Sequence, residues 1–320
     1  MLNHLLDNSN GNLRVGIVGA GNIASGYDFP SSKLITTHSR AIESRDGVKI
    51  IGFYDLNPKA SSLACRKWGG TAYYSLANLL ADAPDIVFVC VPDQAHYAVL
   101  IEILKYPPRL VICEKPLTSN YIDSYNIINS YREAGIGLWT NYQRRLDPTV
   151  SDLANKYRSR SIGEFLSGTI WHTKGIKHNG SHGIDLVRFI LGEPSALTAQ
   201  YRRYDYRADD PSVFGTLEYN NGAIAILPGD ERAYSIFELD LLFESGRYRF
   251  HHSGMRLTKQ TPDDDPVFPG YKELITEDTI STGFVGSLGV LVDCCLEWFI
   301  DNRNIAICDS SNFLQTQLIC

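Results

Sequence analysis

The first candidate for chemistry is a glycine-rich segment near the N-terminus. It runs from Gly19 to Ala24 and directly follows the apolar run Leu13–Val18. A first glycine permits a tight turn, a second lets backbone N–H groups approach a ligand, and a small residue lets the next helix pack closely. The start of that helix would add partial positive charge. The segment therefore predicts a turn that binds the pyrophosphate of a dinucleotide through Gly19, Gly21, Asn22 and Ile23. A glycine turn without a ligand is the alternative.

An acidic residue at the end of the next strand is a candidate for ribose binding. Asp55 follows the apolar run Val48–Tyr54, where a carboxylate would accept hydrogen bonds from the adenosine ribose hydroxyls. It lies further along the chain than the usual roughly 20 residues, and the stretch Ser25–Ser32 looks like an insertion that accounts for the difference. Because no arginine follows Asp55 immediately, a 2′-phosphate would meet uncompensated repulsion. The sequence therefore favours NAD over NADP.

The elements that position these residues alternate between strand and helix. Three further apolar runs, separated by helical patterns, follow the first two strands: Asp85–Val91, Leu110–Cys113 and Ile136–Thr140. Strands that are apolar throughout, with helices between them, are typical of a parallel sheet covered on both faces. The pattern predicts a doubly wound α/β domain, which we place at residues 12–145.

After about Arg145 the pattern changes to shorter and often alternating strands. Six strand-like runs are expected: Phe165–His172, Ser195–Tyr204, Ser212–Tyr219, Ala223–Leu227, Ser235–Phe243 and Arg247–His251. A helix over Ser181–Leu191 interrupts them, and the Asp- and Pro-rich segment Thr261–Gly270 is expected to be a loop. Two helices, near Gly286–Asp301 and Ser310–Leu318, follow. This predicts a second, α+β domain over residues 146–320.

Composition restricts the class of protein. The 320 residues are 44% hydrophobic with a formal net charge of -6, which argues against nucleic-acid and membrane-surface binding. No run of about 18 apolar residues is present, and Met1–Gly11, which has no Lys or Arg, is expected to be a loose tail and not a signal peptide. The seven cysteines lack the spacing of metal ligands, so we expect no metal site but buried thiols of a cytoplasmic protein.

Four further segments carry a family resemblance. Val91–His96 and Cys113–Leu117 each follow an expected strand, the second with the signature Glu114-Lys115-Pro116, and Tyr142–Pro148 and Gly180–Asp185 lie further on. With the glycine turn, these segments make the chain resemble the Gfo/Idh/MocA oxidoreductases, which are named for glucose–fructose oxidoreductase and inositol dehydrogenase. The resemblance runs from about Leu13 to the end.

This resemblance implies a Rossmann domain followed by an open, mostly antiparallel sheet. It also implies cofactor contacts at Val91, Pro92, His96, Glu114 and Lys115, with a cis bond between Lys115 and Pro116. In such enzymes the lysine reaches the reacting hydroxyl and the nicotinamide, and a histidine matching His182 serves as the acid/base. An aspartate usually precedes that histidine by four residues, but this chain has His178 there.

The three proposed catalytic residues have chemistry that suits alcohol oxidation. Lys115 beside a positive nicotinamide ring would share or lose its proton more easily, and His182 titrates near neutral pH. His178 would lie on the same helix face as His182 if the helix began early enough. The structural alternatives are a salt bridge for Lys115, a core position for His182 and a lining role for His178.

Further residues are candidates for substrate binding. Asn179 and Asp185 flank His182, His172 and Lys174 end a strand, and Arg144 could meet an anionic group. For Asp185 a structural role, for His172 and Lys174 plain surface placement, and for Arg144 or Arg145 a surface ion pair stay open.

The leading hypothesis is an NAD-dependent oxidoreductase that acts on a ring hydroxyl or keto group of a sugar or nucleotide sugar. The fold also allows an epimerase or an NAD-dependent glycosidase that recycles its NAD, and a non-catalytic dinucleotide-binding regulator. Relatives commonly pair through the exposed face of the second sheet, so the resemblance also implies a homodimer or homotetramer.

Overall fold

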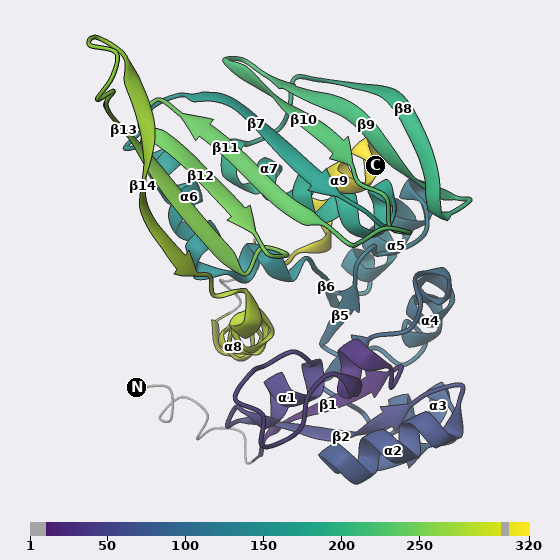
Figure 1. The fold of residues 1–320 in the computed structure, drawn as a ribbon. Coiled ribbons are helices and arrows are strands. Elements are labelled where there is room, and N and C mark those ends of the chain that lie inside the picture. The colour runs from purple at the N-terminus through teal and green to yellow at the C-terminus, as the bar shows by residue number, and fades with distance from the viewer. Residues whose placement is uncertain (1–10, 302–306) are drawn as a thin grey trace. The chain divides into compact units, whose positions relative to one another are not determined.

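The computed structural model describes residues 11–301 and 307–320 (Figure 1). The chain forms two compact units. Unit 1 runs to Leu146 and also takes in Val285–Gln315, whereas unit 2 comprises Asp147–Phe284 and Thr316–Cys320. Each unit has a sheet of its own.

Unit 1 contains a six-stranded parallel sheet in the order β3-β2-β1-β4-β5-β6. Its strands are β1 (Leu13–Val18), β2 (Val48–Tyr54), β3 (Thr71–Tyr73), β4 (Ile86–Val89), β5 (Leu110–Glu114) and β6 (Gly137–Asn141). The central strand β4 is buried along its whole length, as its uninterrupted apolar sequence requires. The doubly wound architecture predicted from the sequence is confirmed, with the strand order of a Rossmann fold.

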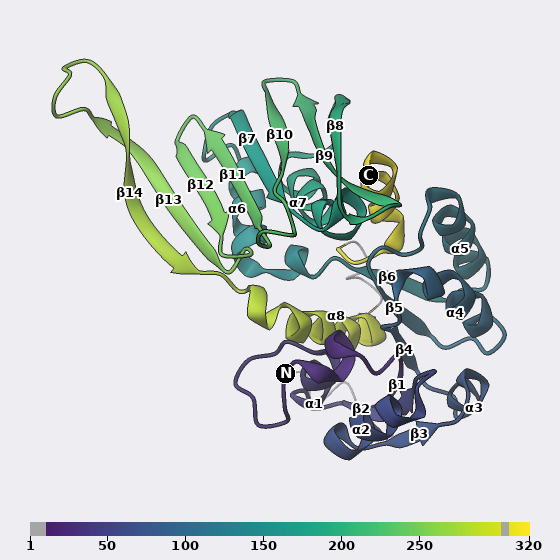
Figure 2. The same cartoon turned by 45° about the vertical axis from the view of Figure 1, so that its right-hand side comes forward.

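Helices cover both faces of this sheet. They are α1 (His38–Glu43), α2 (Pro58–Trp68), α3 (Leu76–Ala81), α4 (His96–Ile103), α5 (Tyr121–Glu133) and α8 (Ser287–Asp301). Apolar residues of α1, α2 and α8 share one core cluster with the sheet, and those of α3, α4 and α5 share the other. Figure 2 shows α8 alongside α1, where Arg45 and Asp293 form an ion pair of 2.7 Å.

Unit 2 contains an eight-stranded sheet in the order β14-β13-β12-β11-β7-β10-β9-β8, which is antiparallel except for the β7–β10 pair. The strands are β7 (Phe165–His172), β8 (Ala196–Arg207), β9 (Asp210–Tyr219), β10 (Gly222–Pro228), β11 (Phe237–Phe243), β12 (Gly246–His251), β13 (Arg256–Asp264) and β14 (Lys272–Ser281). The open, mostly antiparallel sheet that the resemblance implied is therefore confirmed.

The helices of unit 2 pack on one face of this sheet. Helices α6 (Pro148–Arg158) and α7 (Ser181–Leu191) form one apolar cluster with the buried residues of the strands. Strand β11 shows why the helices cover only one face. Its alternate residues Phe237, Leu239, Leu241 and Phe243 are buried toward the helices, and the residues between them are not. The boundary between the units falls within the last helix, α9 (Leu314–Ile319).

The expected loop over Thr261–Gly270 is wrong in its first part. Strand β13 continues to Asp264, and β14 begins at Lys272, so the loop covers only the residues between them. The Asp265 carboxylate accepts hydrogen bonds from the N–H groups of Val267 and Phe268 and closes this loop. Figures 1 and 2 show the resulting hairpin extending beyond the neighbouring strand β12.

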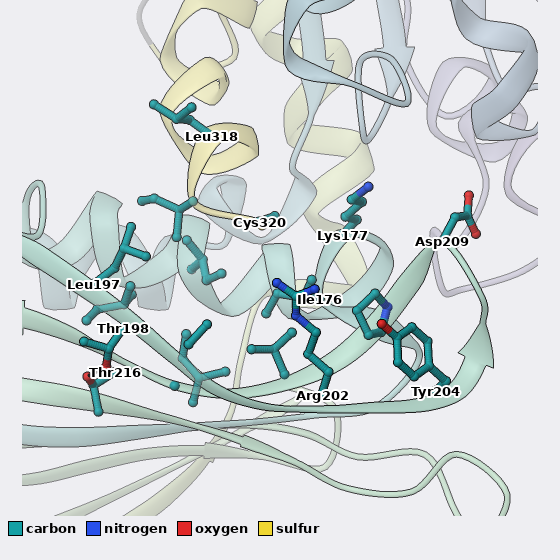
Figure 3. A pocket seen from close by; sticks show the side chains of 18 of the residues that line it. Ile176, Lys177, Leu197, Thr198, Arg202, Tyr204, Asp209, Thr216, Leu318 and Cys320 are labelled. Atoms are coloured by element: carbon teal, nitrogen blue, oxygen red, sulfur yellow. Dashed lines mark hydrogen bonds between the residues drawn. The ribbon is translucent and has the colours of Figure 1, made fainter.

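A pocket of about 470 Å³ lies within unit 2. Figure 3 shows it between β8, which contributes Thr198, Arg202 and Tyr204, and the C-terminal residues Leu318 and Cys320. In the part of the chain that the structure describes, none of the sequence-predicted site residues lines this pocket. The described helices are all too short or too polar to cross a membrane. Within the same ranges, no three His, Cys, Asp or Glu side chains gather to hold a metal ion.

Candidate active site

The two glycines of the N-terminal turn have different surroundings. Gly19 follows β1 with φ +92°, and a Cβ there would lie 2.6 Å from the carbonyl oxygen of Cys90 on the neighbouring chain segment. Only glycine fits such a position without strain. Gly21 is extended, and a Cβ there would have no heavy atom within 4 Å. The turn is thus closed against the protein at Gly19 and open at Gly21, which suits the close approach of a pyrophosphate.

The helix that follows this turn differs from the expectation. Asn22 and Ile23 open a single π-helical turn that ends at Gly26, and α1 begins only at His38. The sequence predicted a helix start that would add positive charge, but a turn of five residues aligns few peptide dipoles. The backbone N–H groups of the turn, more than a helix dipole, are therefore the groups available to an anionic ligand.

Asp55 lies beside the glycine turn. Its carboxylate accepts hydrogen bonds from the N–H groups of Ala20 at 2.7 Å and Asn57 at 2.8 Å, one on each oxygen. A carboxylate has about four lone-pair positions, so both oxygens keep capacity for ribose hydroxyls. The half-buried Asp55 side chain thus fixes the turn to the end of β2 and fits the role predicted for it.

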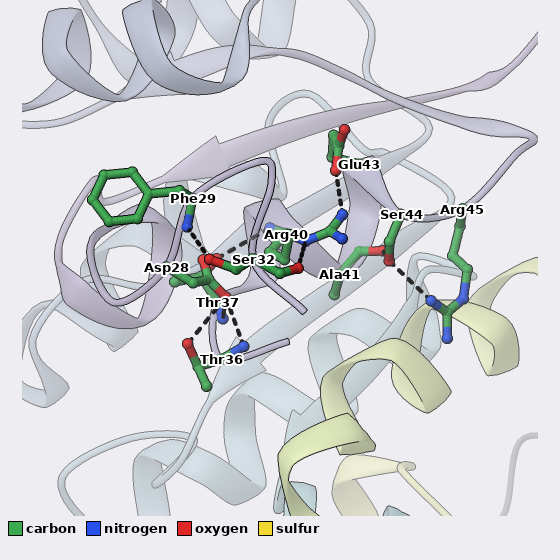
Figure 4. Close-up of polar contacts among 10 residues, drawn as sticks. All are labelled: Asp28, Phe29, Ser32, Thr36, Thr37, Arg40, Ala41, Glu43, Ser44 and Arg45. Atoms are coloured by element: carbon green, nitrogen blue, oxygen red, sulfur yellow. Dashed lines mark hydrogen bonds and ion pairs between the residues drawn. The ribbon is translucent and has the colours of Figure 1, made fainter. Parts of the chain in front are cut away.

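The insertion after the turn is organised by a buried carboxylate that the sequence analysis did not identify. Asp28 is 4% exposed and accepts hydrogen bonds from the backbone N–H and side-chain hydroxyl groups of both Thr36 and Thr37 (Figure 4). Thr37 in turn caps α1, because its hydroxyl oxygen accepts from the N–H of Arg40 at 3.1 Å. Asp28 therefore sets the position at which α1 begins.

Lys115 lies at the carboxyl end of β5, next to a cis Lys115–Pro116 bond, as the resemblance implied. The imidazole of His96 is fully buried and lies 2.7 Å from the carbonyl oxygen of Pro116 and 2.9 Å from that of Val91. His96 thereby links the segments that follow β4 and β5. Pro92, beside Val91, is exposed.

Glu114 has two buried partners that sequence reasoning missed. Its Oε1 is 2.7 Å from His38 Nε2 and accepts a hydrogen bond from Asn141 Nδ2, also at 2.7 Å. Burial alone would raise the pKa of the Glu114 carboxyl, but the hydrogen bond and charge of His38, with help from Asn141 and Lys115, outweigh it and lower the pKa. Glu114 is therefore a carboxylate at neutral pH. Asn141 ends β6 at the sheet edge where Lys115 lies, and this position was the only sequence signal for it.

In unit 2, His182 is the second residue of α7. It is 9% exposed, and its ring lies edge-on to Phe237 with 6.2 Å between centroids. His178 lies in a π-helical turn, Gly175–Gly180, which precedes α7. The condition for His178 and His182 to share one face of a regular α-helix is therefore not met. The His178 ring instead lies 5.4 Å from that of Tyr206.

A second buried carboxylate holds the segment that carries His178. Asp210 accepts hydrogen bonds from the backbone N–H groups of Lys177 at 2.8 Å and His178 at 2.9 Å. A Cβ on Gly175, at φ +74°, would lie 2.2 Å from the Asp210 carboxyl carbon, so glycine is required there. Burial raises the pKa of Asp210, and these two hydrogen bonds only partly offset it. The sequence carried no signal for this role.

The predicted substrate-binding residues fall into buried and accessible groups. His172 is fully buried, and burial lowers its pKa, so its ring is neutral at pH 7. Asp185 is 1% exposed and accepts a hydrogen bond from the Thr316 hydroxyl at 3.2 Å. Lys174 and Asn179 are only half-buried, and Lys174 pairs with Glu231 at 3.4 Å.

The two arginines differ in their surroundings. Arg144 of unit 1 is half-buried. Arg145 is 6% exposed, and its guanidinium lies 4.6 Å from the centre of the Phe313 ring. This geometry is that of a cation–π contact.

Two family models match the chain. Residues 13–142 match the model of an oxidoreductase family with an NAD-binding Rossmann fold, and residues 168–249 match the GFO/IDH/MocA C-terminal domain. The first match contains the glycine turn, Asp55 and Lys115, and the second contains His178 and His182.

Several curated relatives are sugar or polyol dehydrogenases. D-glucoside 3-dehydrogenase of Escherichia coli is 23% identical over 251 residues, which cover 66% of this chain and 68% of that protein. Inositol 2-dehydrogenase of Corynebacterium glutamicum is 28% identical over 182 residues, which cover 56% of this chain and 49% of that protein. The matched segments span 49% to 69% of the relatives' own lengths.

The fold recurs in solved structures. The WlbA dehydrogenase from Bordetella pertussis, solved with NADH and UDP-GlcNAcA, has a TM-score of 0.74 at 18% identity and covers 96% of this chain and 93% of that one. The two family models, which together take in both units, and the shared fold lead to one conclusion. The chain belongs to the Gfo/Idh/MocA family of oxidoreductases and carries its NAD-binding Rossmann fold.

Proposed function

We propose that this protein is an NAD-dependent dehydrogenase or reductase that acts on a ring hydroxyl or keto group of a sugar or nucleotide sugar. One observation supports this most strongly. The glycine turn follows β1, Asp55 follows β2, and Lys115 follows β5, so parallel strands bring all three to one edge of the sheet. Ligands of doubly wound sheets bind at this carboxyl edge.

The chain's own residues suit the cofactor. The open backbone at Gly21, with Asn22 and Ile23, would bind the pyrophosphate, and Asp55 would accept hydrogen bonds from the ribose hydroxyls. Val91 and Pro92 would line the cofactor site, and His96 and Glu114 would support it from within. NAD, when bound, supplies the hydride acceptor and donor.

We assign the proton chemistry to Lys115 and His182. Lys115 would hold the reacting hydroxyl and share its proton, and His182 would take up or return that proton as general base or acid. His178 would assist from the segment that Asp210 fixes. Of the substrate-binding candidates, Lys174, Asn179 and Arg144 have accessible surface, whereas the buried His172 and Asp185 would support this region from within.

A screen with NAD and with NADP tests the proposal. Free sugars, polyols and nucleotide sugars would be offered to the purified protein, and NADH formation would be followed by absorbance. Substrate-dependent accumulation of NADH is expected. Conversion of a sugar with an unchanged nicotinamide pool would replace this proposal by the epimerase or glycosidase alternative. NAD binding without turnover of any compound would favour the regulator.

We also propose that residues 12–145 bind the dinucleotide and that residues 146–320 provide substrate binding and oligomer contacts. The exposed face of the unit 2 sheet supports a homodimer or homotetramer, and light scattering of the purified protein tests this. All seven cysteines are free thiols, which supports a cytoplasmic location. The substrate would be the partner, with no nucleic acid and no membrane involved.

A further inference from the structure

A buried histidine, His38, contacts the side chain of Glu114, the residue that precedes Lys115. His38, 1% exposed, and Asn141, 2% exposed, both contact the same oxygen of Glu114 at 2.7 Å. Glu114 thus has one oxygen held by donors from α1 and β6, two elements that are far apart in the sequence. A carboxylate held in this way has one orientation, and the backbone that continues into Lys115 is fixed with it.

The position of His38 depends on the insertion after the glycine turn. His38 is the first residue of α1, and its imidazole also packs against the Phe88 ring at 5.0 Å. The α1 cap, Thr37, is held by the buried Asp28 carboxylate, as Figure 4 shows. A continuous set of contacts therefore runs from the insertion, through the start of α1, to the carboxylate beside Lys115.

We propose that His38 is a positioning residue for Lys115, which acts by holding the Glu114 carboxylate in place and in its charged form beside the lysine ammonium. The inference rests on the proposed function of Lys115. The inference also explains a role of the insertion, because Asp28 fixes the start of α1 and so positions His38 to contact Glu114.

The groups that lower the Glu114 pKa come from three different elements. His38 approaches from α1, Asn141 from β6 and Lys115 from the end of β5, and together they lower the Glu114 pKa against the effect of burial. The thiols of Cys90 and Cys113 also interact with Glu114, and burial raises the pKa of both well above the ordinary value. The Asp93 carboxylate, which acts on Cys113, is a further acidic group in this region. Both thiols are therefore uncharged at neutral pH, and neither opposes the attraction between Glu114 and Lys115.

This arrangement predicts a particular pH dependence. A carboxyl with a lowered pKa stays charged until the pH falls through that value, and only then does the lysine lose its neighbouring charge. Without His38 the Glu114 carboxyl is buried with less compensation, so its pKa rises and the loss occurs at higher pH. The acid limb of activity should move upward in the same way.

The first test needs no substrate. In protein labelled with isotope at the glutamate carboxyl carbons, Glu114 gives the NMR signal that is missing from the Glu114→Gln variant. Its titration midpoint is expected to be higher in His38→Leu than in the unchanged protein. The exposed His252 provides a control, since His252→Gln should leave the midpoint where it is. An unchanged midpoint in His38→Leu overturns the inference.

The second test uses turnover. His38→Leu should lower kcat on the order of tenfold, with little change in KM, and should move the acid limb of kcat/KM to higher pH. His38→Gln keeps a hydrogen-bond donor and should recover most of kcat. A uniform loss of active protein with an unmoved acid limb would mean a merely structural role and would overturn the inference.

The two tests separate the inference from the proposed function. If the unchanged protein oxidises no sugar or polyol, the proposed function fails, and the NMR midpoint still decides whether His38 controls Glu114. If His38→Leu does not fold, His38→Gln replaces it in the titration, because a neutral amide at position 38 must also raise the Glu114 midpoint. An unmoved midpoint in that variant again overturns the inference.

Discussion

Lys115 and Asp55 are single side chains whose chemistry depends on the backbone around them. Asp55 already accepts two backbone hydrogen bonds, so its carboxylate is oriented before any ligand arrives. Lys115 follows the carboxylate Glu114, and the next residue, Pro116, has its carbonyl oxygen against the buried His96. At this scale the candidate site consists of residues whose orientation is fixed by hydrogen bonds to buried groups, and such preorganisation favours reaction.

Replacing Lys115 tests the assignment of proton chemistry. Lys115→Ala should lower kcat on the order of 10²- to 10⁴-fold, because a positioned proton-transfer group is lost, while NAD binding measured by calorimetry stays close to that of the unchanged protein. Lys105→Ala serves as the control, since Lys105 is an exposed lysine paired with Glu102. Loss of NAD binding by a folded Lys115→Ala variant would contradict the assigned role.

Under the proposed function, Asp55 would determine the preference for NAD over NADP. Asp55→Ala should weaken NAD binding about tenfold or more, because a charge-assisted hydrogen bond contributes about 1.5–3 kcal/mol. It should also reduce discrimination against NADP, since the charge that repels a 2′-phosphate is gone. Fluorescence titration with both cofactors measures this. An unchanged NAD/NADP preference would mean that the ribose lies elsewhere.

At the scale of elements, the glycine turn offers a matched pair of substitutions. Gly19→Ala should destabilise the protein by about 1–3 kcal/mol, because its Cβ would meet the Cys90 carbonyl at a left-handed φ. Gly21→Ala meets nothing in the free protein, so its unfolding free energy should stay within about 0.5 kcal/mol. Its NAD affinity should nevertheless fall about tenfold, equivalent to about 1.4 kcal/mol. Denaturant unfolding and NAD titration together measure both effects, and equal NAD affinity of Gly21→Ala would contradict the predicted pyrophosphate site.

The segment that carries His178 should show a characteristic pH dependence. The Asp210 pKa is raised above its ordinary value of 3.8, so the folded protein binds this proton more tightly than the unfolded chain does. The resulting stabilisation is complete below the ordinary pKa and is lost as the pH rises through the raised one. Compared with Asp210→Asn, the unchanged protein should therefore lose relative stability as the pH rises over this acidic range.

Denaturant unfolding at a series of pH values measures that difference. The exposed neighbour Asp209 provides the control, because Asp209→Asn removes the same charge from the β8–β9 turn without removing a buried carboxylate. A difference between the unchanged protein and Asp210→Asn that does not vary with pH would contradict the predicted linkage.

A burial pattern made some strands predictable from the sequence, whereas β14 was not predicted. The wholly apolar β4 and the alternating β11 both carry their environment in their residues. By contrast, β14 is exposed along its whole length and is held by backbone pairing with β13. A strand of this kind at a sheet edge leaves no hydrophobic period to detect.

The same distinction applies to the candidate site of the whole molecule. The positions of Asp55 and Lys115 at strand ends could be placed from the sequence, because apolar runs determine where strands end. His38 lies 76 residues from Glu114, and Asn141 lies 27 residues from it. Only folding brings such partners together, so no local pattern reveals His38, and Asn141 is indicated only by its place at the end of a strand.

Helix α8 has a consequence for the synthesis of the chain. Its apolar residues Leu288, Leu291, Val292, Cys295 and Leu296 belong to the core of unit 1, yet β6 ends at Asn141 and α8 ends only at Asp301. A ribosome that adds about 5–20 residues per second needs on the order of 10–30 s to travel that distance. During this interval the face of the sheet that α1 and α2 cover lacks its third helix. The nascent polypeptide should therefore attract chaperones until translation has passed this late helix.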